Sequence, residues 1–363
     1  MFPNALLVIF FLILALPSPG QNAASQIKAE TQRLQQSLKD KPISDPDFRD
    51  LNSMAEGGLK AAAEALSAGW FYLSLERLNQ ASDLLHGARF AAEKKAATTK
   101  GGMPVFESEW SRASLSLSAL EQETRKSNWN DAPAALRALA ETAQGRTMPL
   151  LDGARGFAIA TGPKDGLFYL GEAQGQAEFT KLCASLDFPR KAGTLPRRSL
   201  LPELRSLQEK TNAAFVPPRS TELHPRFIAL NSTLNVAREL DAARAYSGAL
   251  YQYLDAVRHY GMLDAPPVDA ARQSELKAAA VALLKKLAAS GRDDSIAQLF
   301  AERAASQVAP PGGSAPSADE WRSAQVIIDQ VMPAYYATLK AASPLQQASG
   351  KTIDLTLVRW PYT

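Results

Sequence analysis

The chain has 363 residues, of which 46% are hydrophobic and 21% charged. This length and composition predict a folded protein with a large core, and the net charge of +3 is too small for a protein that binds nucleic acid through bulk electrostatics. Good helix formers dominate most of the sequence, whereas Val, Ile and Thr are sparse. We therefore predict an all-α protein, a helical array or bundle of roughly ten helices with one short β-strand at the C-terminus.

Residues 1–20 are unlike the rest of the chain. Residues 5–16 form an uncharged apolar run, which has the length of the apolar part of a signal peptide, whereas a membrane-spanning helix needs about 20 residues. The small residues Ser18 and Gly20 stand at the positions that precede a signal-peptidase cut before Gln21. The sequence thus predicts a signal peptide and a periplasmic or secreted protein. The alternative is a protein that this segment anchors in the inner membrane.

A proline-rich segment divides the helical part of the chain. Residues 21–186 are predicted to form an N-terminal helical half, and residues 227–307 a second half. Between them, 187–226 is rich in proline and in basic residues. Because proline lacks a backbone donor and ends helices, we interpret this segment as a connector that contains one short helix at about 200–214.

The C-terminal part begins with a second connection. Residues 308–318 have the composition of a flexible linker. Ser317 and Glu320 are spaced as a capping box, in which each side chain binds a free backbone donor of the other, and this predicts a helix start. Residues 319–363 are therefore expected to contain a helix followed by the strand.

The strand prediction depends on alternation near the C-terminus. Apolar residues alternate there with polar ones, at Ile353, Leu355 and Leu357, and a period of two is typical of a strand. A strand needs a partner for its backbone hydrogen bonds. That partner is either 153–162, for which a helix is an equally good prediction, or a strand of another protein. Trp360 and Tyr362 follow the strand and are candidate binding residues.

Residues 247–263 hold the most concentrated set of chemically capable side chains. On a helix, Tyr251, Asp255 and His259 lie on one face at four-residue steps, with Arg258 beside Asp255. An Asp–His pair at this spacing can form a hydrogen bond that fixes the imidazole tautomer. His259 would then be a general base oriented by Asp255, and Tyr251 and Arg258 would stabilise negative charge.

The alternative for the same segment is an ordinary packed helix. Its other face carries an apolar stripe made of Tyr246, Leu250, Tyr253, Val257 and Tyr260. This pattern places Tyr253 in the core and leaves Tyr251 on a solvated face with a ladder of ion pairs. We favour this interpretation, because residues on adjacent turns of one helix cannot surround a substrate.

The basic connector and the remaining motifs give weaker signals. The connector offers a possible site for anions or lipid headgroups, and hence for peripheral membrane contact, at Arg190, Lys191, Arg197, Arg198 and Arg205. The alternative is a solvated loop whose charges meet acids elsewhere, and we favour it. No HExxH, CxxC, GxSxG or GxGxxG motif occurs, so we predict neither a metal nor a cofactor. The one cysteine, Cys183, is expected to be a small buried residue.

Three segments begin with the same Gly-x-x-Tyr pattern, at Gly69, Gly166 and Gly248. They are either degenerate repeats or a coincidence of composition.

Taken together, the features of the sequence predict an exported, non-catalytic helical scaffold or binding module. Its partner would be another envelope or secreted protein and not a nucleic acid. The alternative is an all-helical extracytoplasmic enzyme, lyase-like or hydrolase-like, that uses the helix face of Tyr251.

Overall fold

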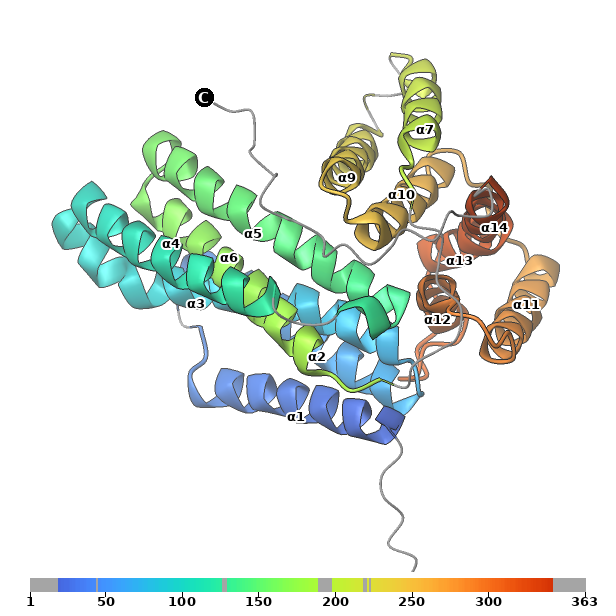
Figure 1. The fold of residues 1–363 in the computed structure, drawn as a ribbon, viewed down its shortest axis with the longest axis horizontal. Coiled ribbons are helices and arrows are strands. Elements are labelled where there is room, and N and C mark those ends of the chain that lie inside the picture. Colours follow the sequence, from blue (N-terminus) through green and yellow to red (C-terminus); the bar gives the residue numbers. More distant parts are fainter. Residues whose placement is uncertain are drawn as a thin grey trace, which may run out of the picture.

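The computed structural model describes residues 19–43, 45–125, 129–188, 198–217, 221 and 223–341. Within these ranges every regular element is a helix (Figure 1), so the all-α prediction is confirmed for this part of the chain. The predicted C-terminal strand, Trp360 and Tyr362 lie outside the described residues, as do 1–18 of the predicted signal peptide. The prediction that 153–162 forms a partner strand is wrong, and the alternative prediction of a helix is confirmed, because the residues up to Ala160 are the end of α5 (Ala134–Ala160).

The first half of the chain is a bundle of long helices. They are α1 (Pro19–Asp40), α2 (Arg49–Ser67), α3 (Phe71–Gly101), α4 (Met103–Arg125), α5 (Ala134–Ala160) and α6 (Pro163–Ser185), with short 3-10 turns at Pro46–Phe48 and Trp129–Asp131. Helices α2 and α3 form one packed hairpin, α5 and α6 form another, and α3 packs along α6. Figure 1 shows α1 lying along one side of this bundle.

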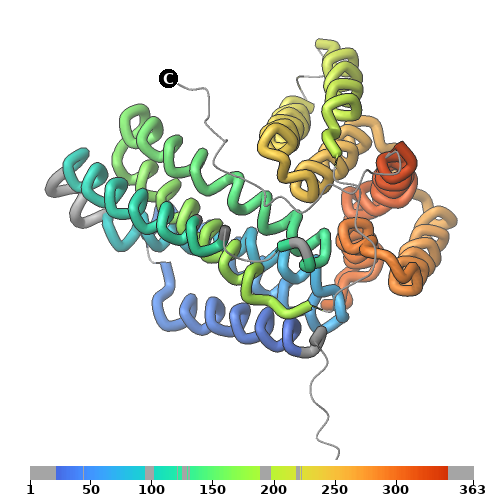
Figure 2. Tube along the Cα trace, in the orientation of Figure 1, coloured from blue at the N-terminus to red at the C-terminus, as the bar shows by residue number. Residues whose placement is uncertain are grey.

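The second half is made of shorter helices. They are α7 (Leu201–Ala214), α9 (His224–Ala242), α10 (Tyr246–Gly261), α11 (Ala270–Ala288), α12 (Ser295–Val308), α13 (Ala318–Val326) and α14 (Met332–Ala341), with a π-helical turn at Ile327–Val331 between the last two. Figure 2 shows this half at one end of the bundle. It is joined there by contacts of α10 with α5 and of α12 with α3 and α5.

Several local predictions for this half are confirmed. The short helix predicted in the proline-rich connector is α7. The capping box at the start of α13 forms with both of its bonds, from Ser317 N to Glu320 Oε2 at 2.7 Å and from Glu320 N to Ser317 Oγ at 3.2 Å. In the first half of the chain, Cys183 of α6 is buried as expected, and burial raises the pKa of its thiol.

The Gly-x-x-Tyr segments are not equivalent in the structure. Gly69 has a φ of +78° and lies in the turn that follows α2, which is closed by a bond from Trp70 N to Ala65 O at 2.9 Å. Gly166 and Gly248 instead lie within the first turns of α6 and α10. The shared letters therefore mark different places in the helices, which favours coincidence over repetition.

Close helix packing explains another pair of glycines. Gly171 lies in the middle of α6, where α6 crosses α3. A Cβ at this position would lie 2.8 Å from the Cα of Gly87 and 2.7 Å from the Cβ of Phe90, which is closer than atoms pack in real structures. Glycine is thus required here because the two backbones touch.

Several helix starts are capped by carboxylates from another helix. The first free N–H groups of a helix need acceptors, yet the residue before α5 is Pro133, whose side chain offers none. Asp293 Oδ2 accepts from the N–H of Ala134 at 2.8 Å, and Ser295 Oγ accepts from the N–H of Ala135 at 2.9 Å. These two residues precede and begin α12, so they fix α12 against the start of α5.

The same arrangement recurs at α3 and α10. Glu302 of α12 is fully buried and accepts from the N–H of Leu73, near the start of α3, at 2.9 Å. Glu141 of α5 accepts from the N–H of Gly248, in the first turn of α10, at 2.6 Å. Glu302 and Glu141 thus have a structural task, which is to satisfy helix N-termini across helix contacts.

Candidate functional site

Helix α10, which carries the predicted catalytic residues, lies where the two halves of the molecule meet (Figure 1). Tyr251 is buried there, with 7% of its surface exposed, whereas Tyr253 and Tyr260 are only partly buried. The expected solvated face is therefore wrong. The sequence pattern could not reveal this, because the cover over Tyr251 comes from α3 and α12, which are far away in the sequence.

A buried polar network connects these three helices. Tyr251 donates its hydroxyl proton to Glu76 Oε1 of α3. Arg303 of α12 contacts the same carboxylate, with Nε at 3.3 Å from Oε2, and its Nη2 lies 3.3 Å from the Tyr251 hydroxyl oxygen. Nη1 of Arg303 also donates to Asp255 Oδ1 at 2.6 Å. One guanidinium thus holds two carboxylates from different halves of the chain.

Arg258 and His259 complete the network at its outer edge. Arg258 Nε donates to Asp255 Oδ1 at 2.9 Å, and His259 Nε2 lies 3.3 Å from Asp255 Oδ2. The predicted contact between Asp255 and His259 is therefore confirmed. The same imidazole nitrogen lies 3.0 Å from Arg258 Nη2, so both neighbours of His259 are themselves members of the network.

The electrostatics favour fixed charges over proton transfer. Burial alone would raise the pKa of Asp255, but Arg258 and Arg303 outweigh it and hold that pKa well below its usual range. Burial, together with the neighbouring Glu76, raises the pKa of Tyr251 well above that of a free phenol. Tyr251 consequently remains protonated and serves as a donor. A catalytic tyrosine base would need a shift in the opposite direction.

The network resembles a structural clasp more than a reaction centre. Its two carboxylates, Glu76 and Asp255, are balanced by Arg303 and Arg258, and each group has a partner inside the protein. No member of the network lines the open groove between α7 and α9 that is described below. What the arrangement does physically is to join α3, α10 and α12.

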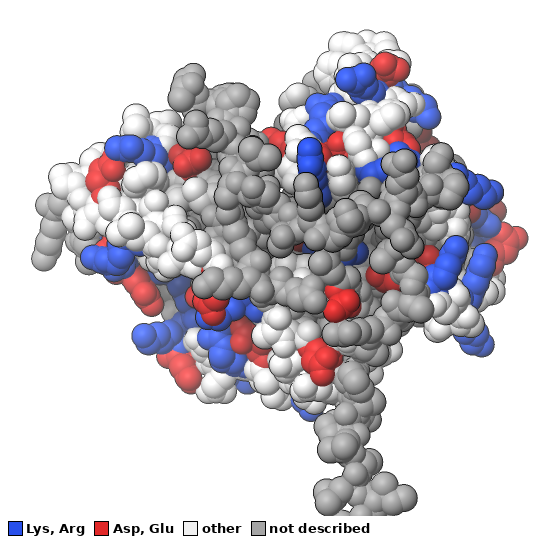
Figure 3. All heavy atoms as spheres, in the orientation of Figure 1, with Lys and Arg blue, Asp and Glu red and all other residues white. Residues whose placement is uncertain are grey.

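The basic connector is only partly described. Arg190, Lys191 and Arg197 lie outside the described residues. Arg198 forms an ion pair with Glu203 and also donates to the backbone oxygen of Thr338 at 3.3 Å. Because these bonds attach the start of α7 to α14, Arg198 is not free to receive an anion. Figure 3 shows acidic and basic side chains interspersed on the visible face.

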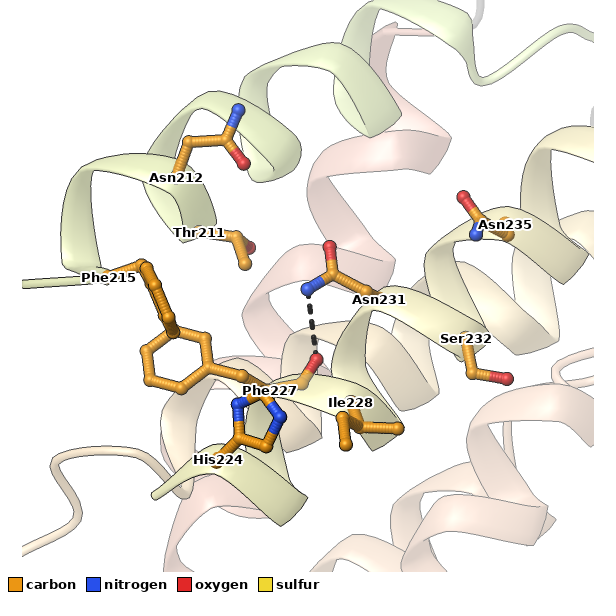
Figure 4. A pocket seen from close by; sticks show the side chains of 9 residues that line it. All are labelled: Thr211, Asn212, Phe215, His224, Phe227, Ile228, Asn231, Ser232 and Asn235. Carbon is orange, nitrogen blue, oxygen red and sulfur yellow. Dashed lines mark hydrogen bonds between the residues drawn. The ribbon is translucent and has the colours of Figure 1, made fainter. Parts of the chain in front are cut away.

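An open groove lies between α7 and α9, in the region that the sequence indicates only as a connector and a helix start (Figure 4). Its volume is about 710 Å³. The lining residues belong to α7, to α9 and to Phe215, which directly follows α7. They are Thr211, Asn212, Phe215, His224, Phe227, Ile228, Asn231, Ser232 and Asn235. None of these side chains carries a permanent charge.

The floor of the groove is apolar at one end. The rings of Phe215 and Phe227 meet edge to face, with their centroids 5.1 Å apart. Phe215 is 46% exposed and Ile228 is 56% exposed. Large hydrophobic side chains this exposed, gathered around one hollow, are typical of a surface that another molecule covers.

The polar wall of the groove is oriented by Arg238. A guanidinium can only donate hydrogen bonds, and Arg238 donates to Asn235 Oδ1 at 3.1 Å and to Gln208 Oε1. Gln208 must therefore donate through Nε2, which it does to the oxygens of Asn212, at 2.8 Å, and Asn231, at 3.1 Å.

This chain of bonds has a directional consequence. The amide oxygens of Asn212 and Asn235 are used inside the protein. Within the described part of the chain, no acceptor binds the amide nitrogen of either residue. Both asparagines line the groove, which therefore presents unpaired hydrogen-bond donors beside an apolar floor.

Sequence reasoning missed this groove, although a signal existed. His224, Ile228, Asn231 and Asn235 follow one another at steps of four, three and four residues, which places them on one face of a helix. A face that mixes exposed isoleucine with amides fits neither a core nor an ordinary charged surface. The partner helix α7 could not be assigned to it from sequence alone.

Comparison of the chain with protein-family models, with curated proteins and with solved structures finds no match in any of the three. Among the helices that the structure describes, none is long and apolar enough to cross a membrane. The described residues also contain no group of three or more His, Cys, Asp or Glu side chains placed to hold a metal ion.

Proposed function

We propose that the protein is an exported, non-catalytic binding module and that its contact site is the groove between α7 and α9. The observation that carries this proposal is the open groove, which has exposed Phe215 and Ile228 at its floor and no permanently charged side chain among its described lining residues. The residues with the best catalytic chemistry, by contrast, bind one another inside the protein. We expect the partner to be another envelope or secreted protein.

Export is supported by the apolar run at 5–16. Cleavage before Gln21 would leave the buried residues of α1 in the mature chain, since the first of those that the structure describes is Ala23. N-terminal sequencing of the protein from cells should start at or near Gln21. Intact Met1 in the membrane fraction would indicate an anchor instead.

The binding function can be tested with a photo-crosslinking amino acid in living cells. Placed at Ile228, it should give a discrete crosslinked product with another protein of the envelope or the medium. Ile159 is the matched control, because it is 73% exposed and lies at the end of α5, away from the groove. The same products from both positions, or products with lipid only, would contradict the proposal.

A further inference from the structure

We infer that the groove between α7 and α9 binds an extended, uncharged peptide segment that carries a bulky apolar side chain; this inference rests on the function proposed above. The segment's backbone carbonyls would accept hydrogen bonds from Asn212 and Asn235. Its apolar side chain would pack against Phe215, Phe227 and Ile228.

The charge of the groove selects a neutral ligand. Among the described residues, no side chain with a permanent charge lines it, and Arg238 beside it is already bound to Gln208 and Asn235. An ionised group placed in the groove would lose water without gaining a counter-charge. Electrostatic complementarity therefore favours an uncharged segment.

The hydrogen-bonding pattern selects a ligand that offers acceptors. The bonds that start at Arg238 occupy the oxygens of Asn212 and Asn235 and leave their amide nitrogens without an acceptor in the described part of the chain, on two residues that line the groove. Peptide carbonyls are regularly spaced acceptors that any sequence supplies. The two asparagines stand on opposite walls, one on α7 and one on α9 (Figure 4), so an extended chain between them can be held from both sides.

The size of the groove agrees with a short extended segment. Its lining on α9 runs from His224 to Asn235, which is about 16 Å along a helix at 1.5 Å per residue. About five residues of extended chain span this distance. The edge-to-face pair of Phe215 and Phe227 forms a corner that suits an aliphatic or aromatic side chain better than the flat face of a sugar ring.

The test uses the full mature chain and two kinds of probe. Uncharged octapeptides displayed on phage are selected against it, and the selected peptides are measured by fluorescence anisotropy; a panel of neutral oligosaccharides is measured in parallel. The informative variant is Asn212→Asp. It keeps an oxygen for Gln208 and replaces the free N–H donor by an acceptor, so peptide affinity should fall about tenfold or more.

The controls separate this inference from the proposed function. Asn22→Asp adds the same charge on exposed α1 and should leave the affinity unchanged, while Ile228→Asp should abolish binding. Equal affinities for the Asn212→Asp variant and the wild type, preference for the oligosaccharides, or failure to select any peptide would overturn the peptide inference. The crosslinking comparison of Ile228 with Ile159 tests the groove as a contact site independently of ligand class.

Discussion

Tyr251 illustrates how a single residue can be assigned to the wrong environment by its periodicity. The apolar stripe through Tyr253 is real, but Tyr251 on the neighbouring face is the more buried of the two. Its burial depends on Glu76 and Arg303, to which it is bonded across helix contacts. A hydrophobic pattern reports the faces of one helix and cannot show a second, polar face that distant helices cover.

This assignment predicts the outcome of removing two hydroxyl groups. Tyr251→Phe leaves the Glu76 carboxylate without one of its buried donors, and we expect a loss of about 1–2 kcal/mol in the free energy of unfolding. Tyr253→Phe should change it by less than about 0.5 kcal/mol, as at an ordinary surface position. Urea melts of both variants make the comparison. A larger loss for the Tyr253 variant would restore the original assignment of the faces.

Glu172 of α6 gives the protein a dependence of stability on pH near neutrality. Burial, together with the nearby carboxylate of Asp83, raises the pKa of Glu172 to about 7, although Arg146 opposes the shift. An acid whose pKa is higher in the folded state than in the unfolded state holds its proton more tightly when folded. Stability is therefore undiminished below the unfolded pKa and decreases as the pH rises through about 7.

Glu172→Gln should remove this dependence. Below pH 5 the variant and the wild type should have similar stabilities, and above pH 7 the variant should be more stable by about 1–2 kcal/mol. Thermal and urea unfolding between pH 4 and 9 measures the difference. Glu209→Gln on the exposed face of α7 is the control and should show no such crossover. If the variant were less stable than the wild type at pH 8, the ionised carboxylate of Glu172 would stabilise the folded protein, contrary to this prediction.

At the scale of helices, the features that follow from local chemistry were predictable. The capping box of Ser317 and Glu320 and the short helix α7 depend only on neighbouring residues, and both form as expected. The caps that come from another helix were not predictable. Glu302 and Leu73, for example, are 229 residues apart in the sequence. No local pattern distinguishes an acid with such a distant partner from a solvated one.

Glycines within helices also divide into two kinds that only the structure separates. Gly171→Ala places a methyl group against the backbone of α3 and should cost about 1–3 kcal/mol through overpacking. Gly153 lies in α5, and no atom of a neighbouring element lies within 4 Å of the place that a methyl group would take, so Gly153→Ala should stabilise the protein by about 0.5–1 kcal/mol. Thermal unfolding of the pair provides the measurement. Equal effects of the same sign would show that α3 and α6 do not approach as closely as described.

At the scale of the whole molecule, the sequence predicts two helical halves, but it does not predict which residues make contacts between them. The proline-rich segment indicates where one half ends, because proline limits helices locally. The clasp of Glu76, Asp255 and Arg303 joins α3 to α10 and α12 through residues that are distant in the sequence. The groove between α7 and α9 has the same property, since Asn212 and Asn235 become neighbours only after folding.

The clasp predicts what holds the halves together. Arg303→Met removes the guanidinium and leaves the buried carboxylate of Glu76 without its counter-charge, so we expect a loss of about 3–5 kcal/mol. Arg272→Met, which breaks the more exposed pair with Asp329, should cost less than about 1 kcal/mol. Urea unfolding followed by tryptophan fluorescence and by circular dichroism gives both values.

A double variant then separates the loss of the pair from the cost of the orphaned charge. In Glu76→Gln/Arg303→Met the carboxylate of Glu76 is gone, and the glutamine that replaces it can still accept the Tyr251 hydroxyl proton, so part of the stability lost in Arg303→Met should return. Because Arg303 bridges the two halves, the single variant should also unfold in separate steps, with the two probes no longer coincident. A single variant as stable and as cooperative as the wild type would show that apolar contacts alone join the halves, and that the ion pairs only fill their interface.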